Sequence, residues 1–301
     1  MTQAWFTSPQ DVVDRLGAVG YLADAATATS VFLAGALEKP LLVEGPAGVG
    51  KTELAKAVAR ATDAELVRLQ CYEGLDESRA LYEWNYKKQL LRIQATGQST
   101  GTGAGDGAGE GWDATHDDIF SEEFLLTRPL LTAIRRDDPT VLLIDEVDKT
   151  DVEFEGLLLE VLSDFQVTVP ELGTVTATRK PFVLLTSNAA RELSEAVKRR
   201  CLYLHLDYPE LEREREIVAR AVPGLDDAVV GEVVEVVSRL RGLDLKKSPS
   251  IAESIDWART LVALEIDHLD AETATATLGV VLKHVSDQKR AVTELKSRRR
   301  L

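Results

Sequence analysis

Cysteine is scarce in this sequence, because the 301 residues include only Cys71 and Cys201. Two cysteines so far apart exclude a disulfide scaffold and a zinc knuckle, and they favour a reducing compartment. No apolar run approaches the ~20 residues that a membrane helix needs. The first residues, MTQAWFTSPQ, also lack the basic and apolar segments of a signal peptide. We therefore expect a cytoplasmic protein without a membrane span.

Positive charge is also in short supply. The chain has 35 Lys and Arg against 50 Asp and Glu, a formal net charge of −15. This balance argues against a dedicated nucleic-acid binder, which usually presents a basic face. The cluster KSRRRL at 296–301 is short and is typical of a solvated helix end. No metal-ligand spacing links the cysteines with the four histidines, which are His116, His205, His268 and His284.

What the sequence does contain is an alternation of short apolar runs with helical patterns, followed by an all-helical part. Apolar runs predict strands at 40–45, 64–71, 140–146, 181–188 and 202–206. Helices are expected at 10–37, 51–62, 77–94, 121–136 and 152–165, and a β-hairpin at 166–178 turning at PELG. We predict an α/β core over residues 1–209 and a small α-helical domain over residues 210–301.

The strongest motif is GPAGVGKT, a full match to G-x-x-x-x-G-K-[ST] placed between a predicted strand and a predicted helix. Glycines there allow backbone N–H groups to turn toward a phosphate at a helix N-terminus. Lys51 is expected to reach the β- and γ-phosphates, and Thr52 to ligate Mg²⁺. The predicted nucleotide-binding residues are Gly45, Pro46, Ala47, Gly48, Val49, Gly50, Lys51, Thr52 and Glu53.

Two further strands end in polar residues that fit this chemistry. VLLIDE brings Asp145 and Glu146 to the carboxyl edge of the sheet, where ligands of α/β proteins bind. Asp145 is expected to hold Mg²⁺ with Thr52, and Glu146 to orient or deprotonate the attacking water. LLTSN brings Asn188 to the same edge, where its amide can position water near the γ-phosphate.

Arg199 lies eleven residues after Asn188, within KRRC, where it and Arg200 come just before the last predicted strand. The order of phosphate loop, acidic strand end, Asn strand end, paired arginines and helical domain resembles the AAA+ ATPases. The resemblance implies that one arginine, Arg200 before Arg199, reaches the nucleotide of a neighbouring subunit and stabilises the transition state. It also implies a homo-oligomeric ring, with closure at six subunits.

Within AAA+ proteins the chain most resembles the MoxR family. KPLLVEGPAGVGKTELAKA, LLIDEVDKTD, the VTVPELGTVTA hairpin, FVLLTSN and LHLDYP carry the resemblance across most of its length. Two segments, QCYEGLDESRALYEWNYKKQLL and DIFSEEFLLTRPLL, look like the branch encoded beside carbon-monoxide dehydrogenases, the CoxD-like ATPases. The implied fold is an AAA+ P-loop core with a parallel sheet between helices, a helix-2-type insertion, a β-hairpin and a helical lid.

The resemblance implies a function in enzyme maturation. MoxR ATPases hydrolyse ATP with Mg²⁺, work with a protein carrying a von Willebrand factor A domain, and mature metal- or cofactor-containing enzymes. For this branch the implied client is a carbon-monoxide dehydrogenase-type molybdenum enzyme. Two alternatives stay open: a motor acting on nucleic acid, which the charge of −15 disfavours, and an ATP-dependent assembly switch for another client.

One departure from the family concerns the lid. MoxR lids commonly present SPR, in which the arginine senses the γ-phosphate, whereas this chain reads SPSI and has Ser250 at that place. Either the branch lacks the sensor or hydrolysis is weakened.

The glycine-rich run at 95–112, ATGQSTGTGAGDGAGEGW, has no G-x-G-x-x-G register and no lysine after it. Its small polar composition predicts a flexible insertion at a partner-facing surface and not a phosphate site.

Overall fold

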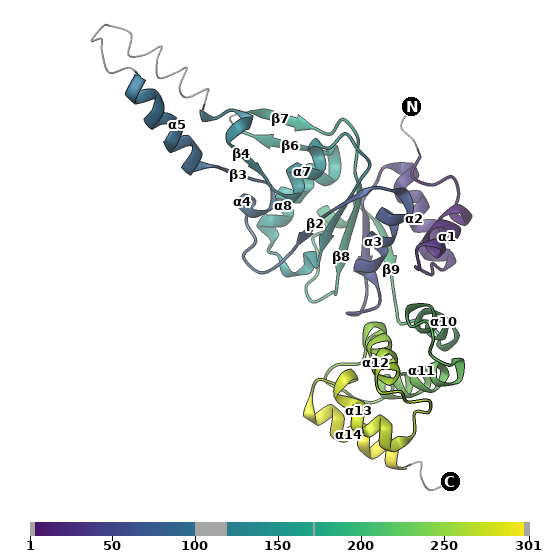
Figure 1. Ribbon diagram of the computed structural model, residues 1–301. Helices are drawn as coiled ribbons and strands as arrows, with labels where there is room; N and C mark the ends of the chain where they lie inside the picture. Colours follow the sequence, from purple (N-terminus) through teal and green to yellow (C-terminus); the bar gives the residue numbers. More distant parts are fainter. Residues whose placement is uncertain (1–3, 100–118, 171, 298–301) are drawn as a thin grey trace.

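The computed structural model describes residues 4–99, 119–170 and 172–297. A parallel sheet of five strands forms the centre of the N-terminal part, in the order β2-β5-β8-β1-β9 (Figure 1). These strands are β1 (Leu41–Glu44), β2 (Glu65–Gln70), β5 (Thr140–Asp145), β8 (Phe182–Ser187) and β9 (Leu202–His205). Every residue of β5 and β8 is buried, as expected for central strands of a parallel sheet that is covered on both faces.

Successive side chains of the central strands point to opposite faces, so the sheet has two apolar layers. Leu142 and Ile144 pack on the side of α7 (Pro129–Arg135) and α8 (Val152–Asp164). Val141 and Leu143 pack on the other side, against α1 (Pro9–Ala18), α2 (Ala25–Leu37) and α3 (Lys51–Thr62). The αβα core predicted from the sequence is confirmed.

Several helices begin where the sequence supplies a side chain that accepts a hydrogen bond from the backbone of the first turn. The helix-starting residues of this kind are Ser8, Asp24, Asp76, Asp151, Ser194, Asp226, Ser250 and Asp270.

Two small antiparallel pairs accompany the main sheet. The predicted hairpin forms from β6 (Gln166–Val169) and β7 (Gly173–Thr176). The second pair, β3 (Tyr82–Trp84) with β4 (Leu125–Thr127), corrects the prediction of continuous helices at 77–94 and 121–136. Only shorter helical pieces remain there, namely α4 (Glu77–Ala80), α5 (Tyr86–Ser99), η1 (Glu122–Phe124) and α7.

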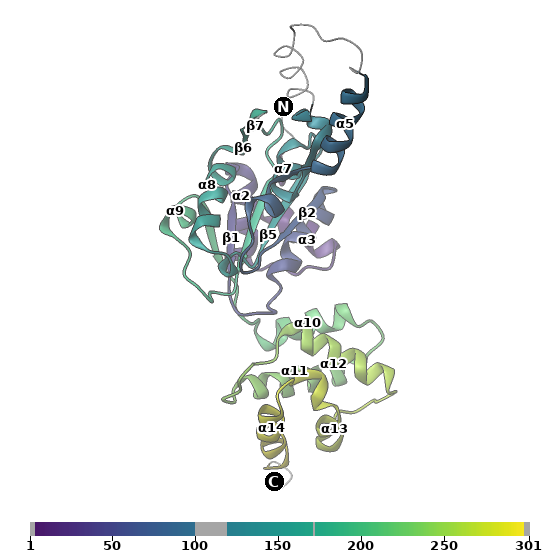
Figure 2. The same cartoon turned by 90° about the vertical axis from the view of Figure 1, so that its left-hand side faces the viewer.

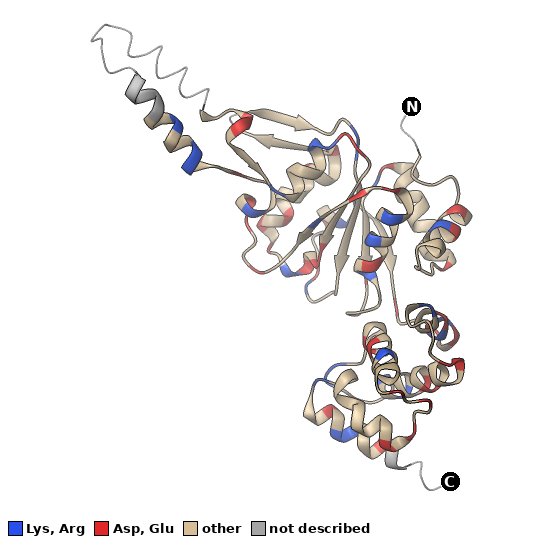
Figure 3. Ribbon diagram, in the orientation of Figure 1, with Lys and Arg blue, Asp and Glu red and all other residues tan. Residues whose placement is uncertain are grey.

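Helix α5 projects from the body of the molecule in both views (Figures 1 and 2). The predicted glycine-rich loop at 95–112 therefore starts within a helix, because α5 continues to Ser99. Residues 100–118, which include the rest of that run, lie outside the described residues. Lys87, Lys88 and Arg92 make α5 basic, with no acidic residue between Tyr86 and Ser99 (Figure 3).

The C-terminal helical region, α10 to α14, has apolar clusters of its own and lies beyond the carboxyl edge of the sheet (Figures 1 and 2). Its helices are α10 (Leu211–Ala221), α11 (Asp227–Arg241), α12 (Ile251–Ala263), α13 (Ala271–Val281) and α14 (Val285–Ser297). Helix α10 contacts the connection between α1 and α2, because Arg213 Nη2 donates to the Ala23 carbonyl at 3.0 Å. Among the described helices, none is long and apolar enough to cross a membrane.

Candidate nucleotide site

The phosphate loop runs from the end of β1 to the first turn of α3, and close approaches require glycine at two of its positions. Gly45 has φ of 155°, and a Cβ there would lie 1.9 Å from the Leu206 carbonyl oxygen. Gly48 has φ of 79°, and a Cβ there would lie 2.2 Å from Ser250 Cβ. Side chains at either position would therefore displace the loop from Leu206, which follows β9, or from the C-terminal helical region.

Lys51, the first residue of α3, is 6% exposed and turns back into the loop. Its Nζ donates to the carbonyls of Gly45 and Pro46 at 2.6 and 2.7 Å, and to Asn188 Oδ1 at 2.8 Å. Burial lowers the pKa of Lys51, while Asp148 and the strand-end carboxylates oppose that shift. The ammonium is thus held by three oxygens at the place where the sequence predicts a phosphate-binding cation.

Asp145, at the end of β5, is 2% exposed and accepts hydrogen bonds from two hydroxyls. Thr52 Oγ1 lies 2.9 Å and Thr186 Oγ1 2.6 Å from its Oδ1. A buried carboxylate beside a hydroxyl supplies the hard oxygen ligands that Mg²⁺ prefers, so these residues fit the metal. Asp145 Oδ2 is paired with Arg68 of β2, at 3.0 Å from Nε and 2.5 Å from Nη2.

Glu146 follows with a left-handed backbone, φ 59° and ψ 48°, directly after β5 ends at Asp145. Its Oε2 accepts from Gln70 Nε2 at 2.8 Å and from Lys149 Nζ at 2.5 Å. Its Oε1 lies 3.4 Å from Asn188 Nδ2. The hydrogen bond that Lys149 donates to Glu146 raises the pKa of Lys149, so this ammonium stays charged beside the carboxylate.

Asn188 lies in the turn after β8 and contacts both Lys51 and Glu146. The next residue, Ala189, has φ of 56°, and the buried Asp148 Oδ2 accepts from Ala190 N at 3.0 Å. Asp148 Oδ1 has no hydrogen-bond partner in the part of the chain that the structure describes. Asp148, in the segment after β5, therefore holds the turn that contains Asn188 through its hydrogen bond with Ala190.

The structure thus brings Lys51, Thr52, Asp145, Glu146 and Asn188 together at one sheet edge. Arg199 and Arg200 lie after α9 (Glu195–Lys198). In the described ranges neither hydrogen-bonds to the phosphate loop, Asp145 or Glu146.

Arg68, Gln70 and Lys149 contact the two acidic side chains and were missed in the sequence. Arg68 and Gln70 are alternate residues of β2, so they share one face of that strand. The alternation of Arg68 and Gln70 is visible in the sequence. It indicates contacts with the acidic side chains only once β2 is known to lie beside β5.

Ser250, which the sequence analysis compared with the arginine of MoxR lids, is 4% exposed and begins α12. It forms a capping box with Glu253, whose Oε2 accepts from Ser250 N at 2.9 Å. The serine therefore builds the start of α12 against Gly48 and offers no cation toward the loop.

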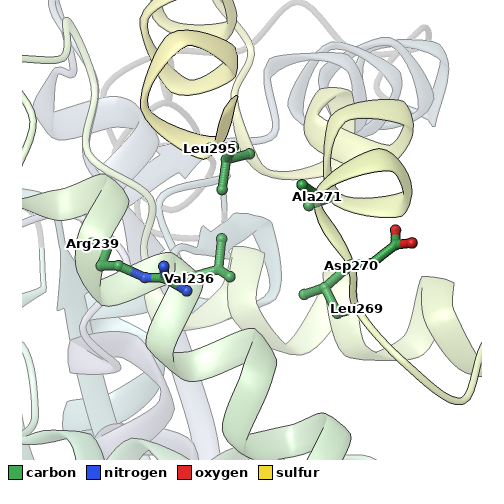
Figure 4. A pocket seen from close by; sticks show the side chains of 7 residues that line it. Val236, Arg239, Leu269, Asp270, Ala271 and Leu295 are labelled. Atoms are coloured by element: carbon green, nitrogen blue, oxygen red, sulfur yellow. The ribbon is translucent and has the colours of Figure 1, made fainter. Parts of the chain in front are cut away.

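A separate cavity of about 200 Å³ opens within the C-terminal helical region, between α11, α13 and α14 (Figure 4). Its lining residues are Val236, Arg239, Leu269, Asp270, Ala271, Ala274 and Leu295. None of them belongs to the phosphate loop or to the strand ends, so this cavity is not the nucleotide site.

Comparisons with known proteins give one family match and several more distant similarities. A model of the ATPase family associated with various cellular activities (AAA) matches residues 41–206, which include all five strands of the main sheet. Uncharacterized proteins of Staphylococcus haemolyticus and Staphylococcus aureus are 24% and 25% identical over 235 residues, covering 76% of this chain and 77% of each relative. A RuvB mutant of Thermotoga maritima superposes with a TM-score of 0.49 at 16% identity, covering 91% of this chain and 71% of that chain.

Proposed function

The chain belongs to the ATPase family associated with various cellular activities (AAA), and on that premise we propose that it is a Mg²⁺-dependent, MoxR-type remodelling ATPase. The observation that carries the proposal is the meeting of Lys51, Thr52 and Asp145 at one sheet edge, with Glu146 and Asn188 beside them. Residues 1–209 would form the nucleotide-binding core, and residues 210–301 would serve as its lid.

Each residue has a defined task in this proposal. Thr52 and Asp145 would hold Mg²⁺, which when bound neutralises charge on the phosphates. Lys51 exchanges its carbonyl and Asn188 partners for the β- and γ-phosphate oxygens. The carboxylate of Glu146 orients the attacking water and accepts its proton, and Asn188 positions that water.

Hydrolysis should depend on Lys51 and Glu146 in different ways. Lys51→Ala removes the phosphate-binding cation, so both ATP binding and turnover should fall, turnover by about 100-fold. Glu146→Gln keeps the phosphate contacts, so ATP should still bind while turnover is lost. Phosphate release and calorimetric ATP binding measure the two effects.

Lys180→Ala is a suitable control for this experiment, because Lys180 forms an exposed ion pair with Glu38. It should hydrolyse ATP at the wild-type rate. Wild-type turnover by Lys51→Ala would refute the proposed site.

The biological role we propose is ATP-driven maturation of a metal-cofactor enzyme. It rests on the MoxR-like and CoxD-like segments of the sequence, and it includes a hexameric ring, a von Willebrand factor A domain partner and a molybdenum dehydrogenase client. The test is activation of an immature molybdenum dehydrogenase by the wild-type protein with ATP. If Glu146→Gln activated the dehydrogenase as well as the wild type does, the protein would act as an ATP-dependent assembly switch and not as a remodelling ATPase. Stimulation of ATP hydrolysis by DNA would favour a nucleic-acid motor.

A further inference from the structure

Arg68 contacts the carboxylate at which the metal is proposed to bind. Strand β2 lies at the edge of the sheet, and its register places Arg68 opposite Leu143 and Gln70 opposite Asp145. The Arg68 side chain extends along the strand to Asp145, and both Nε and Nη2 donate to Oδ2.

Both side-chain oxygens of Asp145 already accept hydrogen bonds. Its Oδ1 accepts from Thr52 and Thr186, and its Oδ2 accepts from Arg68. A divalent cation bound to Asp145 would lie close to the guanidinium, and the two positive charges repel each other. The Arg68 side chain is 46% exposed on an edge strand, so it can move into solvent when a competing cation arrives.

We propose that Arg68 is a positioning residue that occupies Asp145 in the nucleotide-free enzyme, and that Arg68 and Mg²⁺ bind this carboxylate in mutually exclusive states. The inference rests on the proposed Mg²⁺ site of Thr52 and Asp145. Without the metal, Arg68 offsets the negative charge that a nucleotide brings near Asp145, Glu146 and Asp148. When the metal binds, the ion pair between Arg68 and Asp145 must break, and this cost weakens the apparent binding of Mg²⁺.

Two opposite effects of Arg68→Gln follow. The Mg²⁺ concentration that half-saturates ADP binding should fall by about tenfold, because the metal no longer displaces a charged hydrogen-bond donor from a buried carboxylate. ADP binding in EDTA should weaken by a similar factor, because the compensating cation is gone. Arg68→Lys keeps the charge but loses the two-nitrogen contact, so both values should lie between those of the wild type and Arg68→Gln.

The experiment is a Mg²⁺ titration of fluorescent ADP binding to the full-length protein, with thermal unfolding as a check on folding. Arg128→Gln is the matched control, because Arg128 pairs with Glu83 at 2.6 Å with 39% side-chain exposure and lies outside the site. An unchanged or higher half-saturating Mg²⁺ concentration for Arg68→Gln would overturn the inference. No Mg²⁺ dependence in the wild type would instead refute the proposed metal site itself.

Discussion

At the scale of single residues, Arg199 and Arg200 are neighbours in sequence but are held differently. Arg200 Nη1 donates to the Ala196 carbonyl at 3.0 Å, and its Nε donates to Ser163 Oγ. Arg199 is exposed, and its guanidinium makes no hydrogen bond or ion pair within the described ranges. The sequence favoured Arg200 as the residue that reaches a neighbouring subunit, but Arg200 would first have to leave its own. Arg199 needs no such release, so we now expect it to be the finger.

Arg199→Ala should therefore reduce ATP hydrolysis more than Arg200→Ala, by about 1000-fold relative to the wild type if the arginine acts as a finger in trans. ATP affinity should change little, because neither residue contacts the phosphate loop. Phosphate-release rates of the two variants at equal protein concentration provide the measurement. A larger loss for Arg200→Ala would restore the order that the sequence suggested.

At the scale of elements, the sequence predicted what is locally encoded. The apolar runs before Gly45, Asp145 and Asn188 became parallel strands, and parallel strands bring their carboxyl ends to one edge, so these residues were placed together without a structure. Strands β3 and β4 were missed because they are three residues each and pair across about forty residues of chain. The roles of Arg68 and Gln70 depend on strand order in the same way, since only the position of β2 beside β5 brings them to the acidic side chains.

A second element-scale feature is the link between α8 and α9. Glu155 of α8 is 1% exposed and accepts from Arg191 Nη2 at 2.5 Å and from Ser194 N at 2.9 Å. Burial alone would raise the pKa of Glu155, but the hydrogen bonds from Ser194 and Arg191 outweigh it and lower the pKa. This carboxylate anchors the segment that leads to the two arginines.

Glu155→Gln should lower the free energy of unfolding by about 2 kcal/mol at neutral pH, because Arg191 loses its charged partner. Since the folded-state pKa is lowered, this contribution is full above the unfolded pKa of glutamate, about 4.3. It disappears as the pH falls through the folded value. Urea unfolding of both proteins across this pH range should show that the difference between their free energies of unfolding becomes smaller in acid. A difference that does not change with pH would show that the loss of stability comes from packing and not from charge.

At the scale of the whole molecule, the phosphate loop meets the C-terminal helical region where Gly48 approaches Ser250, and α10 is hydrogen-bonded to the N-terminal part. Arg213 and Arg220 of α10 donate to the carbonyls of Ala23 and Gly17 at 3.0 and 3.3 Å. Within the described ranges, Arg199 and Arg200 make no hydrogen bond to the phosphate loop, Asp145 or Glu146 of their own chain. If one of these arginines is the proposed finger, it would act on the nucleotide of a second copy of the chain.

Mixing two inactive variants tests this dependence. Lys51→Ala retains Arg199, and Arg199→Ala retains an intact phosphate loop, so a mixed assembly contains complete sites at some interfaces. A head-to-tail ring assembled at random from equal amounts should recover about a quarter of wild-type activity per subunit. A mixture in which the Lys51→Ala partner also carries Arg199→Ala should stay inactive. Absence of recovery in the first mixture would show that hydrolysis does not use an arginine in trans.

The approach of Ser250 to Gly48 has a consequence for how this protein can be altered. A Cβ at residue 48 would lie 2.2 Å from Ser250 Cβ, so a larger side chain at either position would clash with the other residue. Grafting the arginine that MoxR lids carry onto position 250 would also remove the capping box with Glu253 and push α12 off the loop. Residues 48 and 250 would therefore have to be changed together. A change in the conformation of the phosphate loop at Gly48 would displace α12 and rotate the C-terminal helical region, so the outer surface of that region would move.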